Sequence, residues 1–107
     1  MLSLGETRYA ICFNLAKCLF KETNISVHFY YTGINLYAEI PYTPPVVPKK
    51  ITENVKNYLA EVFDIMILDR EFDEHKLADN SYVRNLRYKV NEELWENIQV
   101  LLKLKGY

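Results

Sequence analysis

Residues 25–40 carry the pattern that most limits the fold, because apolar and polar side chains alternate on both sides of Thr32-Gly33. Alternation with a period of two is typical of a half-buried β-strand, since successive side chains point to opposite faces of a sheet. Glycine can adopt the positive φ that a tight turn between two strands requires. The segment therefore predicts a β-hairpin that turns at Gly33.

The two sides of this predicted hairpin differ in character. Its apolar side predicts these core positions: Phe29, Tyr31, Ile34, Leu36 and Ile40. The opposite side carries His28, Tyr30 and Tyr37, which we expect to face outward. After the hairpin, prolines between residues 41 and 48 predict a stiff extended connection, because proline cannot donate to a sheet ladder.

Three segments have the three- and four-residue spacing of amphipathic helices. The first covers residues 6–23, and its predicted core face is formed by Tyr9, Cys12, Phe13, Ala16, Leu19 and Phe20. Thr52 is the predicted N-cap of the second helix, and Asn91 is the predicted N-cap of the last one. Gly106 is suited to the position that follows the end of the last helix.

Residues 65–90 predict a second pair of strands. The apolar run "IMIL" (65–68) is either a central strand or the last turn of the preceding helix, and the acidic run "DREFDEHKLADN" either extends that strand or forms an exposed loop. Residues 81–90 predict a strand with two distinct faces. Its inward residues are Tyr82, Leu86, Tyr88 and Val90, and its outward residues are Val83, Asn85, Arg87 and Lys89.

The element order is αββαββα, which predicts an α+β fold for residues 1–107 as a single domain. We expect a four-stranded antiparallel sheet with the helices packed on one face, which leaves the other face open to solvent or to a partner. This order is similar to that of the LAGLIDADG homing endonucleases, and loosely to that of the small acidic chaperones of type III secretion. The helix ends "FKETN" and "VFDIM" lack the glycine-acid signature of the first family, so the similarity predicts no function.

Composition narrows the classes of function. The net charge of −1 provides no general attraction to nucleic acid or anionic lipid, and neither GxGxxG nor GxxxxGK[ST] occurs, so we predict no cofactor. No segment reaches the length of a membrane span. Cys12 and Cys18 are six residues apart, a spacing that favours buried free thiols over a mutual disulfide. These features predict a soluble cytoplasmic protein.

The acidic segment concentrates charge. Asp69, Glu71, Asp73 and Glu74 lie within six residues. In an extended strand Asp69, Asp73 and His75 would lie on one side, with Glu71 in the same register, and would form a conceivable metal site. The glycine and spacing of a calcium loop are missing, however, and His28 is the only other histidine, so we predict no metal. The segment is expected to form a solvated acidic patch that meets a basic surface on a partner.

The sequence contains no recognisable catalytic motif, so we do not expect an enzyme. The preferred prediction is a small protein-interaction module of the inhibitor, immunity or adaptor kind, and a homodimer is possible through the same surface. The predicted partner-binding residues are His28, Tyr30, Tyr37, Arg87, Lys89, Asp69, Glu71, Asp73 and Glu74. One alternative is a single-stranded nucleic-acid-binding protein that uses Tyr30, Tyr37, Arg87 and Lys89, and a second is a small enzyme whose site has no motif.

Overall fold

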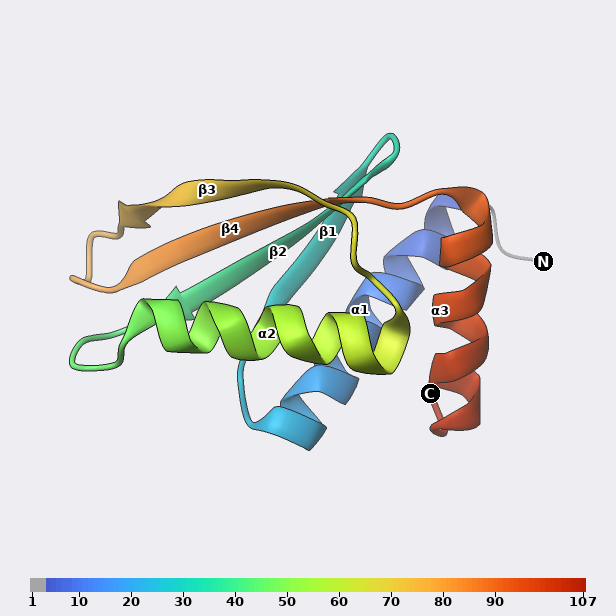
Figure 1. Ribbon diagram of the computed structural model, residues 1–107, viewed down its shortest axis with the longest axis horizontal. Coiled ribbons are helices and arrows are strands. Elements are labelled where there is room, and N and C mark those ends of the chain that lie inside the picture. Colours follow the sequence, from blue (N-terminus) through green and yellow to red (C-terminus); the bar gives the residue numbers. More distant parts are fainter. Residues whose placement is uncertain (1–3) are drawn as a thin grey trace.

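The computed structural model describes residues 4–107, except for the side chains of residues 4–6 and 72–75. Its elements have the predicted order αββαββα (Figure 1). They are α1 (Leu4–Thr23), β1 (His28–Thr32), β2 (Asn35–Tyr42), α2 (Pro48–Phe63), β3 (Leu68–Lys76), β4 (Tyr82–Lys89) and α3 (Glu92–Leu104).

The four strands form one antiparallel sheet in the order β1-β2-β4-β3, so β1 and β3 are its edges. All three helices lie on one side of this sheet, and no helix of residues 4–107 covers its other face (Figure 1). The predicted α+β fold with a four-stranded antiparallel sheet and helices on one face is confirmed. None of the helices in the described part of the chain has the length and apolar character needed to cross a membrane.

The core lies between the sheet and the helices. The inner face of the sheet contributes Phe29, Leu36, Ala38, Ile40, Leu86 and Tyr88, which are all buried. The helices contribute Leu15, Leu19, Leu59, Phe63, Trp95 and Ile98, among others. Burial of this much apolar surface is the main favourable term in folding.

The hairpin turns where it is predicted to turn. Gly33 has a φ of 56°, and the turn consists of Gly33 and Ile34. The prediction that Ile34 belongs to the core is wrong, because 65% of this residue is exposed. Its place in a two-residue turn puts it beyond the last cross-strand pair, Thr32 and Asn35, where the alternation no longer determines which face a side chain occupies.

Helix α1 buries only part of its predicted core face. Cys12 and Leu19 are buried as predicted, and Ala16 packs against the core. Tyr9, Phe13 and Phe20 are exposed instead, whereas Ile11 and Leu15 are buried. The helix contacts both β1 and α3, so two neighbours determine its buried side. Most sides of α1 are apolar, and periodicity does not select one face of such a helix.

Helix α2 begins earlier than predicted. Pro48 occupies its first turn and Val47 is the N-cap, so the prediction of Thr52 as the N-cap is wrong. The fixed φ of proline suits the first helical position. Thr52 is buried inside the helix, where its Oγ1 donates a hydrogen bond to the Pro48 carbonyl oxygen over 2.8 Å.

The run "IMIL" mostly links α2 to β3 and is neither a central strand nor a helical turn. Asp64, in the left-handed region with a φ of 59°, follows the end of α2. Ile65 is buried, Met66 and Ile67 are exposed, and β3 begins at Leu68. Of the two alternatives for the acidic run, the structure has the strand for residues 69–76, which belong to β3, whereas residues 77–80 follow the strand.

Helix α3 has the predicted signals at both ends. Asn91 Oδ1 accepts a hydrogen bond from the backbone N–H of Leu94 over 2.8 Å, and Gly106 has a φ of 93°. Cys12 and Cys18 are free and buried, as predicted.

Candidate functional site

Three outward-facing side chains lie next to one another on the uncovered face of the sheet. The Tyr30 and Tyr37 rings are stacked, with their centroids 4.7 Å apart and their planes at 3°. The His28 ring stacks on Tyr30 at 5.8 Å with an angle of 30°. We call His28, Tyr30 and Tyr37 the aromatic row.

Strand geometry explains why these rings meet. Tyr30 is paired with Tyr37 across β1 and β2, and His28 is two residues from Tyr30 on the same face of β1. Their sequence neighbours Phe29 and Leu36 point to the other face and are buried in the core. The packing of the core therefore determines which way the aromatic row faces.

The row continues into charged groups on β4 and β3. Arg87 is paired with Tyr37 across β2 and β4. Its Nε donates to Asp69 Oδ2 over 2.6 Å, and Lys89 Nζ lies 3.6 Å from Asp69 Oδ1. Hydrogen bonding with Arg87 holds the pKa of Asp69 below its usual value. Rings, cations and one carboxylate thus follow one another across all four strands.

The two stacked tyrosines have phenol groups in different environments. Burial, with a smaller contribution from Glu39, raises the pKa of Tyr30. Hydrogen bonding with Thr32, and then with Arg87, lowers the pKa of Tyr37. Tyr37 is therefore the phenol at which negative charge is better stabilised.

The structure does not bring Glu71 to this face. Glu71 Oε2 accepts from Lys56 Nζ of α2 over 2.8 Å, and Glu71 Oε1 accepts from Arg84 over 3.4 Å. The register of β3 shifts between Leu68 and Arg70, so Asp69 and Glu71 do not share a face as their spacing predicts. The side chains of the other predicted acidic residues, Asp73 and Glu74, lie outside the described part of the chain.

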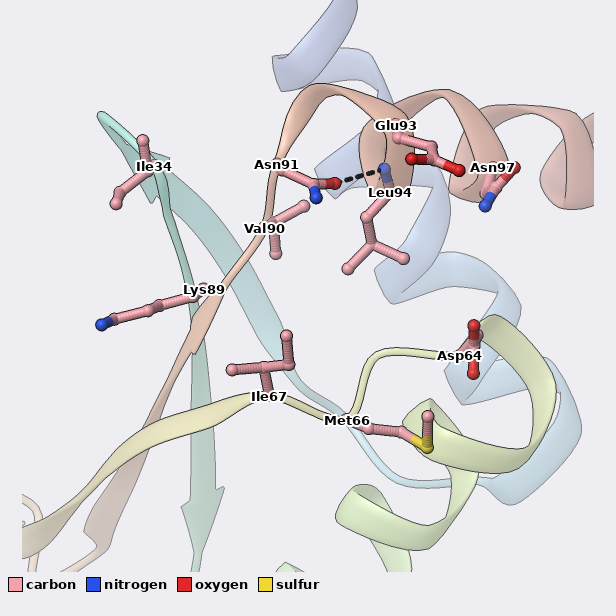
Figure 2. A pocket seen from close by; sticks show the side chains of 10 residues that line it. All are labelled: Ile34, Asp64, Met66, Ile67, Lys89, Val90, Asn91, Glu93, Leu94 and Asn97. Atoms are coloured by element: carbon pink, nitrogen blue, oxygen red, sulfur yellow. Dashed lines mark hydrogen bonds between the residues drawn. The ribbon is translucent and has the colours of Figure 1, made fainter.

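A hollow of about 390 Å³ lies at the end of the sheet near the β1–β2 turn (Figure 2). Its walls are Ile34 of the turn, Met66 and Ile67 of the link after α2, Val90 between β4 and α3, and Leu94 in the first turn of α3. The polar residues that line it are Asp64, Lys89, Asn91, Glu93 and Asn97. Figure 2 shows the apolar side chains grouped around the hollow, with the Lys89 ammonium pointing away from it. Sequence reasoning missed this site, because apolar runs do not reveal which of their residues stay exposed.

The buried thiols and phenols have the most strongly shifted pKa values in the described part of the chain. Burial raises the pKa of Cys12 to about 12 and that of Tyr88 to about 12. Burial also raises the pKa of Cys18, whose Sγ lies 3.3 Å from the Tyr58 hydroxyl. A thiol that stays protonated is a weak nucleophile and a weak metal ligand, so these cysteines act as packing residues.

Among the residues with described side chains, no three His, Cys, Asp or Glu are grouped so as to hold a metal ion. The open sheet face with its aromatic row and the hollow near the β1–β2 turn are two surface features of the described residues that could bind a ligand or a partner. Comparison of the chain with models of protein families, with curated proteins and with solved structures finds no match.

Proposed function

We propose that this protein is a small non-catalytic interaction module of the inhibitor, immunity or adaptor kind, and that it binds a partner protein through the open face of its sheet. The observation that carries the proposal is the aromatic row beside Arg87 on the face that no helix covers. Tyrosine and arginine are the side chains that most often dominate the binding energy of protein interfaces.

The arrangement of this face also favours binding. Tyr30 and Tyr37 are already stacked, and Arg87 is held by Asp69, so these side chains have little conformational freedom left to lose on association. The charged side chains beside the rings carry both signs, since Arg87 and Lys89 flank Asp69. Such a mixed border suits a partner with matching charges and disfavours one without them.

The proposal is tested by replacing both stacked rings with alanine. Tyr30→Ala with Tyr37→Ala leaves the buried core unchanged, so we expect the double variant to fold and to lose capture of the partner from an extract of the native host. Loss of two central rings typically weakens an interface at least about thirtyfold. Capture is quantified by mass spectrometry, and the binding of the purified partner is then titrated.

A matched control changes two exposed residues of α3, Glu96→Ala with Val100→Ala, far from the aromatic row in sequence and element. We expect the control to capture the partner as the wild-type protein does. A folded Tyr30/Tyr37 double variant that binds the same proteins with unchanged affinity contradicts the proposal.

A second function is supported by the coplanar stack of Tyr30 and Tyr37, because exposed rings on a sheet can stack on the bases of single-stranded nucleic acid. Arg87 and Lys89 lie beside the stack, but both contact Asp69, which reduces their attraction for phosphate. Fluorescence anisotropy with labelled single-stranded oligonucleotides distinguishes the two functions. Salt-dependent binding that Tyr37→Ala removes supports nucleic acid as the ligand, and no binding at low salt excludes it.

A further inference from the structure

Three large apolar side chains that stay exposed line the hollow near the β1–β2 turn. Ile34, Met66 and Ile67 are 65%, 62% and 63% exposed, and all three border this space of about 390 Å³ (Figure 2). They come from the turn and from the link after α2, which are far apart in the sequence. Single exposed apolar residues are ordinary on a protein surface, but several that surround one hollow are typical of a ligand site.

Backbone hydrogen bonds hold the walls of this hollow in place. The N–H of Val90 donates to the Ile34 carbonyl oxygen over 2.9 Å, and the N–H of Lys89 donates to the Ile67 carbonyl oxygen over 3.0 Å. The turn and the link are therefore both fixed to the end of β4. Val90, which is buried in the core, forms the back of the hollow. A site that is formed before its ligand arrives loses little conformational freedom on binding.

The charged groups of the hollow give it a negative side. Asp64 lines it from the end of α2, and Glu93 lines it from the first turn of α3. Figure 2 shows both carboxylates on the side of the hollow away from Ile34. Neither carboxylate belongs to an ion pair of the described residues. The positively charged lining residue, Lys89, points its ammonium away from the hollow and toward Asp69, whose Oδ1 is 3.6 Å from it.

We propose that this hollow binds a small organic cation, that is, a molecule with an apolar aromatic or aliphatic body and one ammonium group. The body of the ligand covers Ile34, Met66 and Ile67, and its ammonium group lies beside the carboxylates of Asp64 and Glu93. Small-molecule sites are usually clefts of about 300–1,000 Å³ with apolar walls and a few polar groups, and the volume of this hollow is in that range. The unbranched thioether of Met66 adapts its shape to different apolar bodies.

The charge of the hollow favours a cation over an anion of the same shape. An ammonium group has three N–H donors and needs acceptors, and the carboxylates of Asp64 and Glu93 supply them. Asn97, one turn after Glu93, also lines the hollow and has an amide oxygen that accepts hydrogen bonds. The positive end of the α3 dipole attracts anions, but Glu92 and Glu93 already lie in that first turn and balance it.

This proposal does not rest on the proposed function. Tyr30 and Tyr37, which carry the proposed function, lie on the open face of the sheet and are not among the residues that line the hollow. We expect Tyr37→Ala to leave cation binding unchanged, and variants of Asp64 and Glu93 to leave capture of a partner protein unchanged. Failure of one proposal is therefore distinguishable from failure of the other.

Nuclear magnetic resonance of the methionine methyl groups tests the proposal. The chain has two methionines, and Met66 lies in the hollow, so its methyl signal, assigned with Met66→Leu, reports on binding. The full chain is titrated at pH 7 with phenethylammonium, hydrocinnamate and phenethyl alcohol, which share one apolar body and carry a positive charge, a negative charge and no charge. We expect phenethylammonium to shift the Met66 signal and to bind at least about fivefold more tightly than hydrocinnamate.

Two kinds of variant separate the charge of the hollow from its apolar walls. Asp64→Asn with Glu93→Gln keeps the shape of both side chains, and asparagine tolerates the left-handed φ of 59° at position 64. We expect this double variant to reduce the preference for phenethylammonium over hydrocinnamate to less than about twofold. Ile67→Ser is expected to weaken phenethylammonium at least about fivefold by loss of apolar contact, and Ile34→Ser is the second apolar variant.

Val100→Ser, at an exposed position of α3 that does not line the hollow, is the matched control and is expected to bind phenethylammonium as the wild type does. The proposal is overturned if phenethylammonium leaves the Met66 signal in place at its highest soluble concentration. Hydrocinnamate or phenethyl alcohol that binds as tightly as phenethylammonium also overturns it, and so does phenethylammonium binding that Ile67→Ser and Ile34→Ser both leave unchanged.

Discussion

Gly33 shows how one residue can determine a turn through its backbone alone. Its φ of 56° lies in the left-handed region, where a β-carbon meets the following carbonyl oxygen. A β-carbon added at Gly33 would have no other atom within 4 Å. Substitutions at this position therefore report the conformational preference of the backbone without a contribution from crowding.

We expect Gly33→Ala to lower the free energy of unfolding by about 1 kcal/mol, because the β-carbon of alanine is sterically strained in the left-handed region and glycine has no β-carbon. Gly33→Asn is the matched variant and is expected to cost less than half as much, since asparagine tolerates this conformation. Urea denaturation followed by circular dichroism gives both values. Equal effects of the two substitutions would show that the turn does not depend on the positive φ.

The stability of a single helix also depends on whether the backbone groups at its ends have hydrogen-bond partners. Helix α3 begins after Asn91. The side chain of Asn91 accepts a hydrogen bond from the backbone N–H of Leu94, which is one of the first-turn donors that have no partner within the helix. Trp95 and Ile98 of the same helix are buried in the core. Fraying at the start of α3 therefore exposes core residues as well as backbone.

Asn91→Ala is expected to destabilise the protein by about 1 kcal/mol, which is the usual contribution of a side-chain N-cap. In a chain of this size, the midpoint of thermal unfolding should fall by roughly 4–8 °C. Asn91→Ser, which can accept the same hydrogen bond, is the control and is expected to remain close to the wild type. A serine variant as unstable as the alanine variant would mean that Asn91 acts other than as a cap.

At the scale of the whole molecule, side-chain contacts join the two ends of the chain. Glu22 of α1 accepts a hydrogen bond from Lys105, which follows α3, over 2.8 Å. Arg8 of α1 forms an ion pair with Glu92 and lies against the rings of Tyr31 and Trp95. These contacts hold α1 beside α3, while Tyr9, Phe13 and Phe20 on another side of α1 stay exposed.

The Glu22–Lys105 pair predicts a pH dependence of stability. The hydrogen bond with Lys105 lowers the pKa of Glu22 in the folded protein, so the pair stabilises the fold above the unfolded pKa, which is about 4.3. This stabilisation is lost as the pH falls through the lower folded value. We therefore expect Glu22→Gln to be less stable than the wild type at pH 7, and the difference in urea midpoint to shrink below pH ~4.

Glu96→Gln, an exposed carboxylate on α3, is the control for this series and is expected to change stability little at any pH. A difference between wild type and Glu22→Gln that stays constant from neutral to acid pH would show that Glu22 acts through shape and not through its charge.

Much of the fold and part of the site follow from local patterns. The element order, the turn at Gly33 and the cap at Asn91 are all correctly predicted, because each depends on a few neighbouring residues. The alternation in β1, β2 and β4 also places His28, Tyr30, Tyr37 and Arg87 outward correctly, since a buried strand residue determines the direction of its neighbours.

The tertiary structure alone decided the buried side of α1, the exposure of Ile34, Met66 and Ile67, and the separation of Glu71 from Asp69. Each depends on a neighbour that is distant in the sequence: α3 and β1 for the helix, β4 for the bulged edge, and the ends of the core for the exposed apolar residues. The sequence by itself determined the elements, their order and which face of the sheet each residue of the regular strands occupies, because these arise from interactions within a few residues. Which surfaces remain open depended on packing, since burial is shared between elements and no single segment encodes it.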